Sequence, residues 1–546
     1  MEPLRSLAAR LIAHPRWCAL VLGGLAACGF QPLALWPLTL FALALFIELL
    51  ARAASARAAA WLGWCLGLGH FTIGNNWIAT AFTYQANMPA WLGWIAVVLL
   101  SAYLAVWPAL AAWASWTMVA KLRRGGHGAP EYAMPLLGAV LVPGWIVAEW
   151  LRAWVFTGFA WNPLGVVLLA GYDAQGIAFL APWIGTYGLS GLVVAMAAGL
   201  RHFAHALRLG SPPARIGLVA SVAPLAAIVA GGMIAPASYL PEPEGGVAFT
   251  LVQPDVRQEV LNDPRLFETH FRKIAALSVP RLPESRRLVL WPESGLPDYL
   301  RDGYPRYLYR EMTYGADPAL ARARIGRVIG ERSLLLTGAV DLRIEKGDAA
   351  AARNMITAID GRGHILAGYA KAHLVPYGEY LALRWLLEPL GASRLVAGTI
   401  DFEPGPGPRT YDFGLWGKAG MQICYEIIFS GQVVEPGNRP DYIFNPSNDG
   451  WFGSWGPPQH LAQARLRAIE EGLPVLRATT TGISAVIDAD GIVRQHVPRH
   501  RAGRLDGRIP LAHEATLFAH MGNALPLAIA ALLLIASLVA LCRRRG

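Results

Sequence analysis

Cys424 is the residue whose type and setting first indicate covalent chemistry. It is the only cysteine between residues 236 and 522, so no second thiol there offers it a disulfide or a metal site. It stands at the end of an apolar run, within Gly420–Phe429, and a solitary thiol near activating charges is typical of a catalytic nucleophile. A free cysteine is more often an ordinary buried side chain, so other segments must decide between the two interpretations.

Glu293 lies where a second apolar segment stops. The run Leu288–Trp291 predicts a strand, and Pro292 and Pro297 bound the stop that follows it. In α/β folds the chemistry lies at strand ends, which makes Glu293 a candidate base. Taken alone, the position also suits a solvated or capping glutamate.

Two further segments carry polar residues of possible use. Within Tyr369–Tyr380, Lys371 and Glu379 bracket an apolar turn that contains Pro and Gly. The segment Asn445–Gly453 is too rich in Gly, Asn and aromatic residues for a core strand. Taken alone, Lys371 is typical of a surface lysine, so a catalytic role depends on which residues the fold places beside it.

The composition indicates that much of the chain lies in lipid. Of the 546 residues, 54% are hydrophobic and only 15% are charged, and the chain contains 20 Trp. Soluble domains carry about 25% charged residues. The apolar excess gathers in residues 1–235 and in the last segment of the chain, which leaves a polar block between them.

Apolar runs near the bilayer-spanning length of roughly 20 residues predict seven transmembrane helices before the polar block and one after it. The runs are Trp17–Phe30, Leu33–Leu50, Ala58–Ala79, Ala90–Ala120, Met134–Ala153, Ala181–Leu200, Ile216–Ile234 and Asn523–Cys542. We therefore expect a seven-helix transmembrane domain over 1–235, a catalytic domain over 236–522, and a final helix with a basic tail over 523–546.

Basic residues in alternate loops orient the predicted helices. They lie before the first helix, after the second and the fourth, between the sixth and seventh, and in the tail Arg543–Arg545, whereas the other loops are nearly free of Lys and Arg. The positive-inside rule then places both termini in the cytoplasm and residues 236–522 outside it. Much of the formal charge of +10 is this signal, so no nucleic-acid surface is needed to explain it.

The polar block alternates short β-like runs with helical stretches, which predicts a layered α/β domain. The expected strands are Gly246–Gln253, Arg287–Trp291, Leu334–Ala339, Ala352–Ile359, Ala419–Cys424, Tyr442–Asn445 and Ile483–Asp488. The expected helices are Asp263–Ser278, Ala319–Arg332 and His460–Glu471.

Taken together and in this order, the segments resemble the nitrilase superfamily, and more closely its membrane branch, the apolipoprotein N-acyltransferase family. The motifs that carry the resemblance are Trp291–Ser294, Tyr369–Tyr380, Cys424–Glu426, Ser447–Gly453, Pro458–Ala468 and, in the membrane half, Glu149–Arg152. The resemblance covers essentially the whole chain. It implies a polytopic α-helical membrane domain and an αββα nitrilase-like domain, held in a bacterial inner membrane with the catalytic domain in the periplasm.

The resemblance also implies a Glu-Lys-Cys triad. Glu293 would take the proton of Cys424, and Lys371 would stabilise the oxyanion as a fixed cation. Glu379 is expected to orient Lys371 or the base. A helix that starts at Cys424 would favour the thiolate through its dipole.

Further residues of the motifs are expected to support the triad or to bind substrate. Tyr425 and Glu426 follow the nucleophile and are expected to support the site from behind it. Asn448, Asp449 and Trp451 are expected on a loop near the mouth, where they would contact substrate.

The reaction implied is ping-pong acyl transfer. Cys424 attacks an acyl ester of a phospholipid and holds the acyl group as a thioester, which the amine of a diacylglyceryl-cysteine apolipoprotein then takes as an amide. No cofactor is implied. A metal enzyme is disfavoured, because His270, His364, His373 and His460 lack paired ligand spacing.

Two other functions remain open on the sequence. A membrane-anchored carbon-nitrogen hydrolase (an amidase) would use the same triad on a small amide, yet one anchoring helix would suffice for it. A non-catalytic binding or transport protein would have no need of Glu293, Lys371 and Cys424 together.

The sequence departs from the family pattern at positions near the expected substrate contacts. Asn262 stands where an aromatic residue is usual, and Thr480 and Thr481 replace a turn that is usually Asn-rich. Leu383, Trp385 and Leu386 would either enter the outer leaflet or pack in the core.

Overall fold

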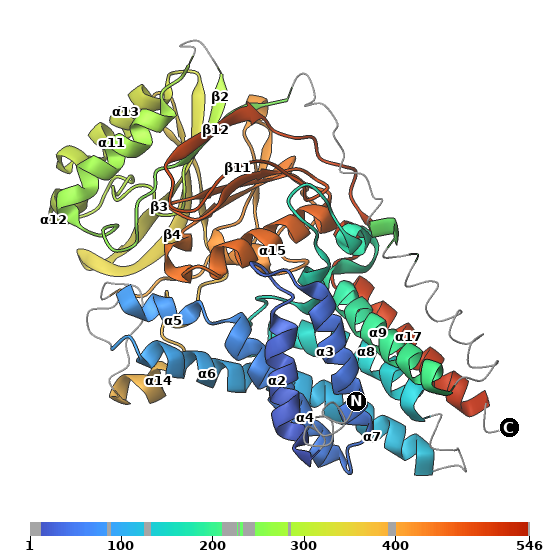
Figure 1. Ribbon diagram of the computed structural model, residues 1–546. Coiled ribbons are helices and arrows are strands. Elements are labelled where there is room, and N and C mark those ends of the chain that lie inside the picture. The colour runs from blue at the N-terminus through green and yellow to red at the C-terminus, as the bar shows by residue number, and fades with distance from the viewer. Residues whose placement is uncertain are drawn as a thin grey trace. The chain divides into compact units, whose positions relative to one another are not determined.

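The structure is a computed structural model that describes residues 13–84, 89–124, 133–209, 227, 230–232, 246–281, 286–390 and 400–543. The chain forms two compact units (Figure 1). The first, here the helical unit, comprises Met1–Ala79, Trp91–Ala237 and Ala515–Gly546. The second, here the strand-rich unit, comprises Thr80–Ala90 and Ser238–Glu514.

The helical unit is built from apolar helices. They are α2 (Pro15–Ala27), α3 (Trp36–Ala51), α4 (Ala56–Gly74), α6 (Leu92–Leu104), α7 (Val106–Arg124), α8 (Ala133–Arg152), α9 (Ala181–Leu209), α16 (Leu517–Met521) and α17 (Ala524–Arg543). Each predicted apolar run coincides with helix except Ile216–Ile234, which lies almost wholly outside the described residues. The run Ala90–Ala120 forms two helices that meet at Ala105, and Gly185 kinks α9 with a φ of 67°.

The length and composition of these helices bear on the membrane prediction. Among the described residues, two helical stretches are long and apolar enough to cross a bilayer, Leu92–Lys121 and Ile177–His205. Shorter apolar helices are Pro15–Ala27, Trp36–Ala51 and Ala524–Val539. In the part of the chain that the structure describes, helices that are long enough to span a bilayer are fewer than the eight that the sequence predicts. The polytopic membrane domain therefore stays a prediction.

Two six-stranded sheets form the core of the strand-rich unit, which confirms the predicted α/β class. The first has the order β12-β1-β2-β3-β4-β5 and the second the order β11-β10-β9-β8-β7-β6. Strands of the first are β1 (Ala248–Gln253), β2 (Arg287–Leu290), β3 (Ser333–Glu345), β4 (Asp348–Asp360), β5 (Ile365–Ala370) and β12 (Gly503–Arg508). Strands of the second are β6 (Thr410–Asp412), β7 (Lys418–Met421), β8 (Tyr442–Ser447), β9 (Val475–Thr479), β10 (Ser484–Ile487) and β11 (Val493–Val497).

Helices cover the outer faces of these sheets, which gives an αββα sandwich. The helices of the unit are α11 (Phe267–Ser278), α12 (Arg306–Met312), α13 (Pro318–Ile329), α14 (Arg384–Leu387) and α15 (Gly456–Glu471). Apolar residues of α11 and α13, such as Ile274 and Ile325, share one core with Val289 of β2 and Leu335 of β3. Contacts of β1 with β9 and β10 join the two sheets, and α15 lies against β9 (Figure 1).

The expected strands and helices are present, with shifted ends. The largest difference near the site is the strand expected over Ala419–Cys424, which ends at Met421. The sequence analysis did not include β5, β6, β9, β11 and β12. Their side chains include buried polar groups, such as Arg477 and Thr479, that mask the apolar pattern of a strand.

Candidate active site

The structure brings Lys371 and two predicted carboxylates into contact. Lys371 directly follows β5, and Glu293 lies in the loop after β2. The Lys371 Nζ is 3.0 Å from Glu379 Oε1 and 3.4 Å from Glu293 Oε1. Lys371 is only 1% exposed, which excludes the alternative that it is a surface lysine.

Asn354 of β4 joins the two carboxylates. Its Nδ2 donates to Glu293 Oε1 at 2.8 Å and to Glu379 Oε1 at 2.9 Å. The remaining oxygens accept backbone N–H groups, Glu293 Oε2 from Asn448 and Glu379 Oε2 from Val375, both at 2.8 Å. These four contacts fix both carboxylates in place, so the base and its neighbour cannot turn away from the lysine.

The charge of Lys371 follows from this setting. Burial alone would lower the pKa of Lys371, but Glu379 and then Glu293 outweigh burial and raise it above its ordinary value. The side chain therefore carries a positive charge that both carboxylates stabilise.

Cys424 lies in the turn after β7, at the start of the 3-10 helix η9 (Cys424–Ile428). It is buried, and its φ of 51° is in the left-handed region that non-glycine residues rarely adopt. A helix does begin at Cys424, as expected, but it is a 3-10 helix of five residues, so its dipole is weaker than that of a longer α-helix.

The surroundings of Cys424 favour the neutral thiol. Burial is the largest cause that raises its pKa, and the negative charge of Glu293 raises it further, whereas Lys371 and the backbone N–H of Asn448 lower it. The same Asn448 N–H donates to Glu293 Oε2 at 2.8 Å, so the thiol and the carboxylate lie beside one peptide group. A thiol that keeps its proton at rest needs a base at the moment of attack, and Glu293 is the carboxylate beside it.

Glu426 organises the segment that carries the lysine. Its Oε1 accepts from Tyr369 Oη and from the backbone N–H of Ala372, both at 2.7 Å, and Oε2 accepts from the Ile423 N–H at 2.7 Å. Burial raises the pKa of Glu426 to about 7. Glu426 therefore connects the chain before Cys424 to the chain beside Lys371. Tyr425 is buried and packs edge-on against Phe429.

The residues expected to bind substrate divide into buried and partly exposed ones. Asn448 is buried, with its Nδ2 on Gln258 at 2.9 Å and its Oδ1 accepting from Thr480 at 2.8 Å, so the unusual threonine supports this asparagine. Asp449 is also buried rather than near the mouth. Trp451 is partly exposed and lies edge-on against Tyr84, with 5.9 Å between ring centroids.

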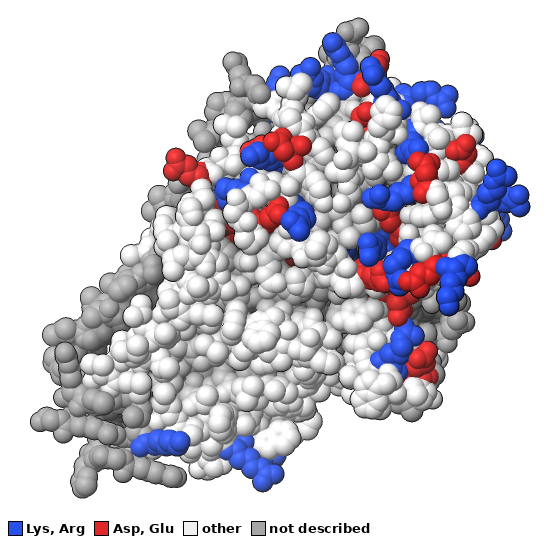
Figure 2. Space-filling view, turned by 180° about the vertical axis from the view of Figure 1, so that it is seen from behind, with Lys and Arg blue, Asp and Glu red and all other residues white. Residues whose placement is uncertain are grey.

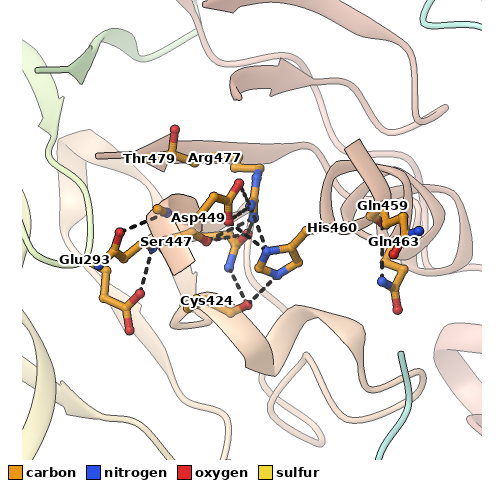
Figure 3. Close-up of polar contacts among 12 residues, drawn as sticks. Glu293, Cys424, Ser447, Asp449, Gln459, His460, Gln463, Arg477 and Thr479 are labelled. Carbon is orange, nitrogen blue, oxygen red and sulfur yellow. Dashed lines mark hydrogen bonds and ion pairs between the residues drawn. The ribbon is translucent and has the colours of Figure 1, made fainter. Parts of the chain in front are cut away.

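A second polar network lies on the other side of the nucleophile, and of its members only Asp449 was expected from the sequence to take part in the site. Arg477 of β9 donates to both oxygens of Asp449, at 2.7 and 2.8 Å, and His460 of α15 reaches the carbonyl of Cys424 (Figure 3). Asn354 was missed in the same way. For Arg477 and Asn354 the available signal was a polar residue inside a strand, in β9 and β4 respectively.

The apolar segment after the lysine motif is exposed. Trp385 is 76% exposed, and Leu383 and Leu386 are 39% and 45% exposed. This excludes the alternative in which they pack in the core of the strand-rich unit.

This arrangement suits acyl transfer through a thioester. A buried thiol, a carboxylate beside it and a fixed ammonium group supply a nucleophile, a base and an electrostatic partner for a developing oxyanion.

The two halves of the chain match two family descriptions. Residues 22–199 match the apolipoprotein N-acyltransferase N-terminal domain, and residues 266–514 match the carbon-nitrogen hydrolase family.

Curated relatives match over nearly the full length. An apolipoprotein N-acyltransferase of Rhodopseudomonas palustris is 33% identical, covering 96% of this chain and 95% of its own. One of Bradyrhizobium diazoefficiens is 33% identical, covering 100% of this chain and 98% of its own. Among solved structures, an amidase from Nesterenkonia sp. AN1 covers 53% of this chain and 95% of its own, at 17% identity and a TM-score of 0.32.

Proposed function

Because the chain belongs to the apolipoprotein N-acyltransferase family, we propose that Cys424 is the nucleophile of its acyl transfer, with Glu293 as base and Lys371 as oxyanion partner. The enzyme N-acylates apolipoproteins. One observation supports the residue assignment above all: the Lys371 ammonium lies 3.4 Å from Glu293, and both groups lie near the buried Cys424 thiol. Glu293 raises the pKa of that thiol and Lys371 lowers it.

The first step forms the acyl-enzyme. Glu293 takes the Cys424 proton as Sγ attacks the carbonyl carbon of a phospholipid acyl ester. Lys371 stabilises the oxyanion of the tetrahedral intermediate. Collapse breaks the ester C–O bond, Glu293 returns the proton to the departing oxygen, and a lysophospholipid leaves a thioester behind.

The second step transfers the acyl group to an amine. The α-amine of a diacylglyceryl-cysteine apolipoprotein attacks the thioester carbonyl and gives a proton to Glu293. The intermediate collapses with loss of the Cys424 thiolate, which regains that proton. The products are the amide and the resting thiol, so no cofactor takes part.

We place this chemistry at a bacterial inner membrane, because both substrates are lipids. The proposed arrangement has a transmembrane domain over 1–235, a periplasmic catalytic domain over 236–522, a final helix over 523–546, and both termini in the cytoplasm. Figure 2 supports it with a broad uncharged surface on the helical unit. The two long apolar stretches Leu92–Lys121 and Ile177–His205 support it as well.

An intact-mass experiment tests the assignment. Purified protein mixed with phospholipid should gain one acyl mass on Cys424, and Cys424→Ala should gain none. A diacylglyceryl peptide should then discharge the adduct as an N-acyl product. Absence of any adduct would refute the nucleophile, and release only as free fatty acid would favour a hydrolase.

A further inference from the structure

The backbone carbonyl of Cys424 is held by two side chains. His460 Nε2 lies 3.1 Å from this oxygen and Asn445 Nδ2 lies 3.4 Å from it. His460 is fully buried on α15, and Asn445 is fully buried on β8. Cys424 adopts its left-handed φ of 51° at this point, a conformation that persists only where the surroundings enforce it.

The direction of the histidine hydrogen bond follows from its partner. A carbonyl oxygen only accepts, so Nε2 of His460 carries the hydrogen in either protonation state of the ring. Burial and Arg477 lower the pKa of His460, which favours the neutral ring with Nδ1 as an acceptor. Nδ1 is 2.9 Å from Arg477 Nη2, a group that only donates, and 3.0 Å from Asp449 Oδ1.

One guanidinium group fixes both donors. Arg477 Nη2 contacts His460 and Asp449, while Nη1 donates to Asn445 Oδ1 at 2.5 Å and to Ser447 Oγ at 2.9 Å. Arg477 therefore sets the ring orientation of His460 and the amide orientation of Asn445 together. Figure 3 shows the His460 ring between Arg477 and the Cys424 carbonyl.

We propose that His460 is a positioning residue for the nucleophile. Its Nε2–H holds the Cys424 carbonyl and so keeps the left-handed backbone that presents the thiol to Glu293 and Lys371. His460 lies on the carbonyl side of Cys424 and takes no proton in either step. The proposal rests on the proposed function, in which Cys424 is the nucleophile.

The test measures the rate of Cys424 acylation per folded molecule by intact mass, across phospholipid concentrations. His460→Leu removes the donor and should lower the maximal rate by about 100-fold with little change in KM, because small misplacement of a reacting group costs about that much. His460→Gln, whose amide can reach the carbonyl, should keep the rate within about tenfold of the wild type. Gln463→Leu, a buried change further along α15 at a side chain whose amide donates to the Gln459 carbonyl, should act at the wild-type rate.

Other outcomes overturn the proposal. A His460→Leu rate within about threefold of the wild type, or a loss seen only in KM, would refute it. If His460→Leu does not fold, His460→Asn replaces it, because its amide is one methylene shorter than that of His460→Gln and falls short of the carbonyl. Equal rates for the Asn and Gln variants would then refute the proposal. A wild-type protein without any adduct would refute the proposed function itself, which separates the two failures.

Discussion

Lys371 is a single cation in contact with two acidic side chains, so it determines the charge balance of the site. Its contacts with Glu379 and Glu293 raise its pKa against the effect of burial, so it keeps its proton at neutral pH. A lysine that stays charged is a poor base. It is suited instead to stabilise negative charge that develops in the transition state.

Replacing this lysine should therefore affect both rate and stability. In Lys371→Met the oxyanion loses its cation, and the acylation rate per folded molecule should fall by about 10²–10³. The two carboxylates would keep their hydrogen bonds but lose the neighbouring positive charge, and the free energy of unfolding should drop by about 3–5 kcal/mol. Intact mass and urea unfolding measure the two effects. Lys273→Met, at an exposed lysine of α11, is the control, and an equal rate in both variants would contradict the oxyanion role.

The pKa of Cys424 offers a test, because two substitutions should shift it in opposite directions. Burial and then Glu293 raise this pKa, and Lys371 lowers it. Thiol alkylation should therefore reach half its plateau rate at a pH above about 8.5, the ordinary value. Glu293→Gln removes a negative charge and should shift that midpoint down, and Lys371→Met should shift it up. Iodoacetamide alkylation followed by mass measures each midpoint, and shifts of the same sign would contradict the charge assignment.

At the scale of elements, a glycine in β3 allows the base to approach the sheet. Gly338 donates its N–H to Pro292 O at 3.2 Å. A Cβ at this position would lie 1.8 Å from the backbone oxygen of Glu293 and 2.5 Å from its Cα. The loop after β2 can therefore lie close against β3 only because residue 338 has no side chain.

Gly338→Ala should displace Glu293 and slow acylation by about 100-fold per folded molecule. Gly368→Ala in β5 is the matched control, because its new Cβ would come closest to the far ends of the Arg301 and Met355 side chains, with the nearest backbone atom, Ile356 O, at 4.0 Å. Acylation rates by intact mass, normalised to folded protein by circular dichroism, compare the two variants. If Gly368→Ala loses as much activity as Gly338→Ala, the loss would reflect a general sensitivity of the sheet to an added side chain and not the displacement of Glu293.

The sequence predicted those elements whose pattern is local. Strands β1 and β2 are short apolar runs, and β3 and β4 contain such runs, so composition alone locates them. The strand β9 was missed because Arg477 interrupts its apolar run, and the arginine is tolerated only through partners far along the chain. Likewise, Asn354 meets carboxylates 61 and 25 residues away, and no spacing rule connects them. The candidate triad came from motif resemblance, whereas its supporting network required the fold.

At the scale of the whole molecule, charge is distributed unevenly. Acidic and basic side chains gather on the visible face of the strand-rich unit, whereas the helical unit presents a surface almost without charge, with basic groups at one edge (Figure 2). Large apolar side chains are exposed on it, among them Trp17, Trp94, Leu99 and Leu532. An apolar exterior of this extent suits contact with lipid, and the basic edge suits the cytoplasmic side of a membrane.

This distribution predicts the accessibility of introduced cysteines in intact spheroplasts. With the five native cysteines replaced, Arg306→Cys on α12 should react with a membrane-impermeant maleimide, because we propose that residues 236–522 lie outside the cytoplasm. Arg57→Cys, in the first turn of α4, should react only after the membrane is permeabilised. Both side chains are exposed, so a difference between them reports the side of the membrane and not burial. Labelling of Arg57→Cys but not Arg306→Cys in intact cells would invert the proposed topology and would move the thioester chemistry to the cytoplasmic leaflet.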